Sequence, residues 1–199
     1  ADISSAAFFL VGATFLKGSE LLLESVGLNP GRTMILKALK MMGADMEVVN
    51  QRTICGEPVG DIKIRYTDNP LAIELGSGDM PSGIDEIPVL ALGAGFARGE
   101  TVFTGLEELR HKESDRLSLI VNNLRRNGVN IKELDDGIAI TGQTSIAGGE
   151  VWETKGDHRM AMTACIASLL FEKPVEVDDL DCVAVSYPEF HDDLNTVLV

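Results

Sequence analysis

Residues 4–29 read SSAAFFLVGATFLKGSELLLESVGLN, and two later stretches repeat their pattern: IDEIPVLALGAGFARGETVFTGLEEL at 84–109 and DHRMAMTACIASLLFEKPVEVDDLDCV at 157–183. Each copy has a polar opening, a long run of small and apolar residues, a short turn, and a β-rich run. The turns near Gly18, Gly99 and Lys173 are spaced by roughly 75 to 80 residues, which is longer than the periods of solenoid repeats. The pattern therefore indicates duplication of a whole supersecondary unit.

The three apolar runs predict buried helices, because they are apolar nearly all round and carry Gly12, Gly93 and Gly95 where a surface helix would have polar residues. The glycines allow close contact between helices at some cost in helix propensity. Ser and Asp are preferred N-caps, and Pro is tolerated in the first turn of a helix. The expected helix ends are Ser4, Asp85 (with Pro88 in the first turn) and Asp157.

Two further helices are predicted to stop at a C-terminal glycine before a strand, at Gly43 in LKMMGADMEV and at Gly128 in LRRNGVNIKE. In the second helix one face is apolar and the other polar. The apolar face has Leu117, Ile120, Val121 and Leu124, and the polar face has Asn122, Asn123, Arg125 and Arg126. Strands are expected near 19–26, 45–50, 61–66, 71–75, 101–104, 130–134, 137–141 and 174–178. This order predicts an α/β or α+β fold with buried helices and outer sheets.

The charge balance excludes some partners. With 17 Lys and Arg against 31 Asp and Glu, the 199-residue chain has a net charge of −14, so we expect neither nucleic acid nor anionic membrane as a partner. An anionic substrate would need the few cations to be concentrated at its site. The cysteines Cys55, Cys165 and Cys182 have no metal-ligand spacing with the histidines and are expected to be buried thiols of a reducing compartment. Without a bilayer-spanning run or signal peptide, a cytoplasmic location is predicted.

Charged residues at two helix beginnings predict the site. Arg159 lies in a first helical turn, where the helix dipole disfavours a cation unless an anion binds there. Lys112 and Arg116 are expected in the first turn of another helix. Glu113 and Arg116 extend the apolar stripe of that helix, so both are expected to point inward, although a solvated charged helix start is the alternative.

Together these residues predict a pocket in which Arg116, Arg159 and Lys112 bind anionic groups and two carboxylates, Asp85 and Glu113, transfer protons. The substrate class that fits is a phosphorylated or carboxylated small molecule. No Walker loop, dinucleotide fingerprint or nucleophile elbow is present in the sequence.

At these residues the sequence resembles the 5-enolpyruvylshikimate-3-phosphate synthase family. The matching segments, in family order, are DISSAAFFL at 2–10, LNPGRT at 28–33, IDEIPVLA at 84–91, GLEELRHKESDRL at 105–117, GDHRMAM at 156–162 and VSYPEF at 185–190. The resemblance implies an inverted α/β barrel built from βαβαββ units around buried helices. It also implies that residues 1–29 end the first domain and residues 30–199 form most of the second, with the N-terminal half absent from this chain.

The resemblance further implies transfer of the enolpyruvyl group from phosphoenolpyruvate to shikimate 3-phosphate, without metal or cofactor, in chorismate and aromatic amino-acid biosynthesis. Asp85 would handle the hydroxyl proton and Glu113 the methylene proton. The remaining roles are Arg116 and Arg159 on the carboxylate of phosphoenolpyruvate, His158 on its phosphate side, Lys112 on the shikimate hydroxyl and nearby phosphate, and Ser5 on the phosphate of shikimate 3-phosphate. Glyphosate is implied as an inhibitor, and this chain alone is expected to be inactive.

Three positions depart from the family pattern. Phe8 stands where a tyrosine is often found, Glu108 where an asparagine occurs, and Val185 where a phosphate-contacting lysine is found. With GLEELR and KESDRLS, these departures resemble the glyphosate-tolerant branch. Two alternatives remain open: a UDP-N-acetylglucosamine enolpyruvyl transferase, and a non-catalytic domain that binds a phosphometabolite.

Overall fold

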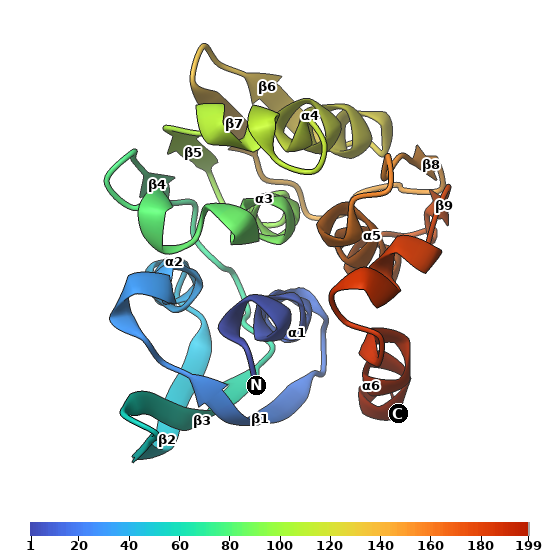
Figure 1. Ribbon diagram of the computed structural model, residues 1–199. Coiled ribbons are helices and arrows are strands. Elements are labelled where there is room, and N and C mark those ends of the chain that lie inside the picture. The colour runs from blue at the N-terminus through green and yellow to red at the C-terminus, as the bar shows by residue number, and fades with distance from the viewer. Residues whose placement is uncertain (199) are drawn as a thin grey trace.

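The computed structural model describes residues 1–198 and places three buried helices at the centre of the molecule (Figure 1). They are α1 (Ile3–Phe15), α3 (Ile87–Ala94) and α5 (His158–Leu170), the three predicted apolar runs. A Cβ added at Gly93 would lie 2.6 Å from the ring of Phe15, and one at Gly12 would lie 3.6 Å from Ile166. The glycines therefore allow the close helix contacts that the sequence predicts.

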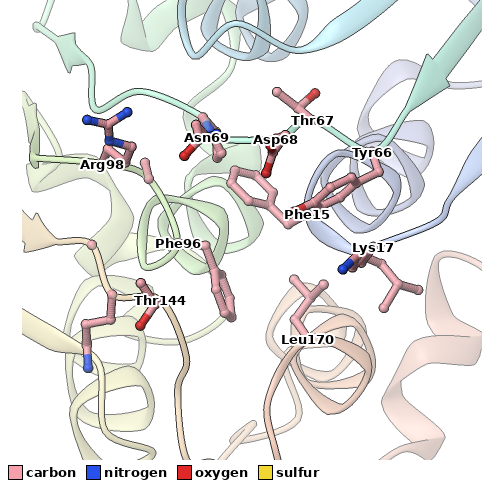
Figure 2. Close-up of a pocket in the computed structure, with 15 residues that line it drawn as sticks. Phe15, Lys17, Tyr66, Thr67, Asp68, Asn69, Phe96, Arg98, Thr144 and Leu170 are labelled. Carbon is pink, nitrogen blue, oxygen red and sulfur yellow. The ribbon is translucent and has the colours of Figure 1, made fainter.

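The helices are parallel, since residues near the ends of all three meet. Figure 2 shows Phe15 and Leu170, the last residues of α1 and α5, around one pocket with Phe96, which lies two residues after α3. The volume of this pocket is about 510 Å³. The beginnings of α3 and α5 meet at the other end, where the side chains of Asp85 and Arg159 approach each other. Three N-terminal helix ends with their partial positive charge thus face one side of the molecule.

The sheets lie outside the helices, as predicted (Figure 1). One antiparallel sheet has the order β1-β3-β2, and a second sheet has the order β4-β5-β7-β6 with β4 parallel to β5. A third, two-stranded parallel sheet pairs β8 with β9. The strands are β1 (Glu20–Gly27), β2 (Asp45–Ile54), β3 (Glu57–Arg65), β4 (Glu74–Leu75), β5 (Glu100–Thr104), β6 (Asn130–Glu133), β7 (Gly137–Thr141), β8 (Val151–Trp152) and β9 (Glu176–Val177).

Three more α-helices cover the molecule: α2 (Met34–Met41), α4 (Arg116–Arg126) and α6 (Phe190–Val197). Short 3₁₀ helices connect the elements: η1 (Pro30–Arg32), η2 (Met80–Ser82), η3 (Ile84–Glu86), η4 (Glu107–His111) and η5 (Asp181–Val185). None of the helices within residues 1–198 is long and apolar enough to cross a membrane. Residues on both sides of Asn29 share one apolar core, so the domain boundary stays a prediction about a longer protein.

Several details of the sequence prediction are wrong. The strand expected at 174–178 forms only as β9, and β8 and α6 were not predicted. Asn123 is buried, because its amide bonds both backbone groups of Glu153, at 2.8 and 2.9 Å. Cys55 is exposed, since it forms the β2–β3 turn with φ of 51°.

The predicted helix ends are also partly wrong. Asp2, not Ser4, caps α1, with its carboxylate accepting from the N–H of Ser5. Asp85 lies within η3, so Glu86 occupies the N-cap position of α3, and neither side chain makes a capping hydrogen bond. Pro88 does lie in the first turn, and Asp157 does cap α5.

Candidate active site

Arg116 is the centre of the charged cluster at the beginnings of the buried helices. It is the first residue of α4 and only 1% exposed, so its position on the inner face is confirmed. Its Nη1 donates to Asp85 Oδ1 at 2.9 Å, Nη2 to Glu113 Oε2 at 2.5 Å, and Nε to Asp157 Oδ2 at 2.7 Å. One guanidinium therefore holds three carboxylates, using the planar fork of donors that arginine provides.

Asp157 anchors this guanidinium from α5 and is completely buried. Its other hydrogen bonds come from the Ser114 hydroxyl at 2.9 Å and from the Arg159 N–H at 3.0 Å. Burial alone would raise the pKa of Asp157, but the hydrogen bonds and charge of Arg116, with the Ser114 hydroxyl, hold it below its ordinary value. Asp157 is therefore a carboxylate that fixes Arg116, a role beyond the helix cap that the sequence predicted.

Asp85 and Glu113 are the two carboxylates of the cluster that reach solvent. Asp85 is partly exposed, and Glu113 is 53% exposed. The prediction that Glu113 points inward on the stripe of α4 is wrong, because α4 begins only at Arg116 and Glu113 lies in the turn before it. Both carboxylates are nevertheless held on separate nitrogens of one guanidinium, which leaves them accessible but fixed.

Lys112 and Arg159 add two cations beside Asp85. Lys112 directly follows η4, so the prediction of a first-turn position is wrong. Its Nζ lies 3.5 Å from Asp85 and 2.6 Å from Glu108. The hydrogen bond to Glu108 raises the pKa of Lys112 further above neutrality. Arg159 does lie in the first turn of α5, and its closest approach to the Asp85 carboxylate is 4.0 Å.

The remaining predicted site residues are His158 and Ser5. His158 precedes Arg159 at the start of α5, and burial together with the charge of Arg159 lowers the pKa of its imidazole. Ser5 lines a cavity with Phe9 and Tyr187, whereas its neighbour Ser4 lines a cavity with Asp85.

The three departures from the family pattern have different surroundings. The ring of Phe8 is buried, with its centroid 6.0 Å from that of Phe190, so it belongs to the core. Val185 is 81% exposed at the end of η5, and Glu108 pairs with Lys112. Glu108 therefore neutralises part of the charge that Lys112 offers.

Sequence reasoning missed a buried acid, Glu86, beside Asp85. It is 3% exposed, and its Oε1 lies 3.8 Å from Arg159 Nη1. Desolvation raises the pKa of Glu86, opposed by a hydrogen bond with Ser4 and by the charge of Arg159. An acid between two apolar residues, Ile84 and Ile87, at the start of a buried helix was the sequence signal that could have found it.

This end of the molecule combines cations, accessible carboxylates and positive helix ends. Such an arrangement suits a small anionic ligand, and two fixed carboxylates suit proton transfer to and from it. No group of three or more His, Cys, Asp or Glu side chains arranged to hold a metal ion is found within residues 1–198.

The sequence profile of EPSP synthase (3-phosphoshikimate 1-carboxyvinyltransferase) matches residues 1–194. The chain belongs to the EPSP synthase family. It is 44% identical over 189 residues to 3-phosphoshikimate 1-carboxyvinyltransferase of Petrotoga mobilis, covering 95% of this chain and 44% of that protein. The enzyme of that name from Gloeothece citriformis is 49% identical over 190 residues, covering 95% of this chain and 42% of the relative.

Solved structures agree with this assignment. The EPSP synthase of Acinetobacter baumannii superposes with a TM-score of 0.93 at 41% identity, over 98% of this chain and 45% of that one. The enolpyruvyl transferase NikO of Streptomyces tendae superposes with a TM-score of 0.73 at 17% identity, which shows the same fold. The α/β fold that the repeats and the family resemblance predicted is confirmed. The chain spans less than half the length of the curated relatives it matches.

Proposed function

We propose that this chain supplies half of a 3-phosphoshikimate 1-carboxyvinyltransferase, which transfers the enolpyruvyl group of phosphoenolpyruvate to the 5-hydroxyl of shikimate 3-phosphate and releases phosphate. The observation that carries the proposal is the pair of accessible carboxylates, Asp85 and Glu113, held on one buried arginine. Membership of the EPSP synthase family and the curated names of the relatives support it.

The reaction needs two proton transfers. Addition of the hydroxyl across the enol double bond removes a proton from oxygen and delivers one to the methylene carbon. Elimination of phosphate then removes a proton from that carbon. We assign the hydroxyl proton to Asp85 and the methylene proton to Glu113. Their separate bonds to Arg116 keep them on different nitrogens, so the two proton transfers are served by two groups.

The cations around Asp85 would bind the anionic groups of the substrates. The Arg159 guanidinium makes one long hydrogen bond, to the backbone oxygen of Asp85, and Lys112 makes one short ion pair, with Glu108. Both cations therefore have N–H donors left for a substrate, and His158 precedes Arg159 in the chain. Arg116 is already bonded to three carboxylates, so its predicted contact with phosphoenolpyruvate requires the substrate carboxylate to replace one of them. The contact between Ser5 and the shikimate phosphate stays a prediction.

The other half of the longer protein would complete the site. Relatives more than twice as long carry the same curated name, so we expect the remaining contacts, and closure of the site, to come from the part that this chain does not match. The boundary after residue 29, inhibition by glyphosate and a cytoplasmic location belong to the same proposal.

A complementation assay tests the proposed function. This chain is mixed with a separately produced first half of a relative, and phosphate release is measured with phosphoenolpyruvate and shikimate 3-phosphate. We expect release from the mixture, no release from either half alone, and loss of release with glyphosate. Release with UDP-N-acetylglucosamine in place of shikimate 3-phosphate would favour the rival transferase. Binding of phosphoenolpyruvate without turnover in a stably assembled mixture would favour the non-catalytic alternative.

A further inference from the structure

Glu86 is an acid at this end of the molecule that has no role in the proposed reaction. It lies at the start of α3, and its side chain is almost completely buried. Its Oε1 has no hydrogen-bond partner within residues 1–198, although buried carboxylate oxygens normally have one. The cation that faces this oxygen is Arg159, with Nη1 at 3.8 Å.

Arg159 has few other contacts that could fix its guanidinium. Nη1 donates to the backbone oxygen of Asp85 at a long 3.5 Å, and Nη2 lies 4.0 Å from the Asp85 carboxylate. Arg116, in contrast, is fixed by bonds of 2.5 to 2.9 Å. Arg159 therefore keeps N–H donors free for a ligand. The buried carboxylate of Glu86 can orient the Arg159 guanidinium by electrostatic attraction.

The carboxylate of Glu86 lies between Gly83 and a small cavity. A Cβ at Gly83 would lie 3.0 Å from Glu86 Oε2, so that side of the group is closely packed. The Ser4 hydroxyl accepts from Arg32 Nη2 at 3.0 Å, and Ser4, Arg32, Asp85 and Glu86 line a cavity of about 80 Å³. The acid is thus buried beside Gly83 and this small cavity, and its unpartnered oxygen faces Arg159.

We propose that Glu86 is a positioning residue that holds the Arg159 guanidinium in the orientation that receives an anionic substrate group. The identity of that group rests on the proposed function, whereas the hold on Arg159 does not. Desolvation raises the pKa of Glu86, so burying this charge is costly, and the fold retains it where it faces a substrate-binding cation.

The first test needs no ligand and uses the 199-residue chain itself. The ¹⁵N side-chain spectrum follows the Nε–Hε signals of Arg159 and Arg116, assigned with the Arg159→Lys variant. In Glu86→Gln we expect loss of the resolved Arg159 signal through faster exchange with water, while the Arg116 signal and the backbone amide spectrum stay unchanged. An unchanged Arg159 signal in this variant would overturn the proposal.

A pH titration separates positioning from a change of structure. The charged groups that face Glu86 are Arg32, Asp85 and Arg159. In the wild-type chain, acidification that protonates Glu86 should release the Arg159 signal, as the substitution does. Glu86→Gln should show no such transition, and Asp85→Asn should keep it. A transition that persists in Glu86→Gln would assign the hold to Asp85 and refute the proposal.

Adding phosphoenolpyruvate distinguishes this inference from the proposed function. With the separately produced first half of a relative present, the Arg159 signal of the wild-type chain should shift as the substrate is added. If nothing shifts while Glu86→Gln still releases Arg159, the positioning role stands and the proposed use of Arg159 fails.

Discussion

Two buried aspartates, Asp61 and Asp157, show how differently one residue type is used in this chain. Asp61 lies on β3, the central strand of its sheet, and accepts hydrogen bonds from the Ser25 N–H and the Asn50 amide, both at 2.8 Å, and from Arg52 at 3.4 Å. Ser25 and Asn50 have φ of 56° and 51°, and both neighbouring strands shift register at these residues. Asp61 therefore fixes the irregularities of one sheet.

The network of Asp157 is built differently. Its partners come from the loop before α4 and from the first turns of α4 and α5, and its main partner Arg116 also carries Asp85 and Glu113. Asp61 faces one arginine in a local, balanced set, whereas three carboxylates share Arg116. Carboxylates that share one buried cation are typical of functional sites, and this sharing distinguishes the network at the proposed site from the network within the sheet.

The largest expected effect comes from breaking the functional network at its centre. Arg116→Leu leaves Asp157 buried without its cation, so the free energy of unfolding should fall by about 3–5 kcal/mol. Arg126→Leu, on the same helix but in an exposed pair with Glu153, should cost below about 1 kcal/mol. Chemical denaturation measures both, and adding Asp157→Leu should recover part of the loss. Equal losses for the two arginines would remove the distinction between the networks.

Glu113→Gln should affect activity and leave stability nearly unchanged. Glu113 is exposed and outside the helix, so the melting temperature should hardly move. Turnover of the assembled enzyme should fall about a hundredfold, which is about 2.7 kcal/mol of activation free energy. Glu107→Gln is the control, since Glu107 is exposed on η4 and forms no ion pair within residues 1–198. A lower melting temperature with intact turnover would make Glu113 a structural ion-pair partner.

The periodic features were predictable from the sequence. The three apolar runs, two of them with Gly12 and Gly93, form the buried helices. They were predictable because a helix that is apolar on all sides has no polar face to expose to solvent. Arg116 was predicted to face inward from its place on the stripe of α4. The helix ends were predicted less well: Glu113 and Lys112 fall outside α4 because Asp115 caps it, with its carboxylate accepting from the Ser118 N–H at 3.0 Å.

The contacts between distant segments could not be predicted from local patterns. Asp157 reaches Arg116 across 41 positions, and Arg159 reaches Glu86 from another repeat unit. Local rules explain Asp157 completely as a helix cap, so nothing in its own segment indicates a second partner. Likewise, Asp61 is a single acid within a strand. Its hydrogen bonds to both neighbouring strands can be predicted only when the pairing register of the strands is known.

Asp61→Ala is expected to destabilise the protein less than Arg116→Leu does. The Ser25 N–H and the Asn50 amide would lose their acceptor, and two left-handed residues would lose the contact that fixes them. The melting temperature should fall by a few degrees, with Asp61→Asn intermediate and phosphoenolpyruvate binding unchanged. Asp68→Ala, an exposed residue without an ion pair or side-chain hydrogen bond in residues 1–198, should change nothing measurable. Weakened ligand binding in Asp61→Ala would show that the sheet and the site are coupled.

The smallest effect is expected from Glu86→Gln, and it should have the opposite sign. Desolvation raises the pKa of Glu86 in the folded state above its unfolded value near 4.3. The stability that this group contributes is therefore fully present below about pH 4 and is lost as the pH rises through the folded pKa. Glu86→Gln should melt slightly higher than wild type at pH 7, and the difference should disappear near pH 4. For Asp61 the hydrogen bond from the Ser25 N–H lowers the pKa, so its contribution is lost as the pH falls. The melting temperatures of Glu86→Gln and Asp61→Asn, each relative to wild type, should change with pH in opposite directions across this range. The same pH dependence for both variants would show that burial of the Glu86 charge costs no stability.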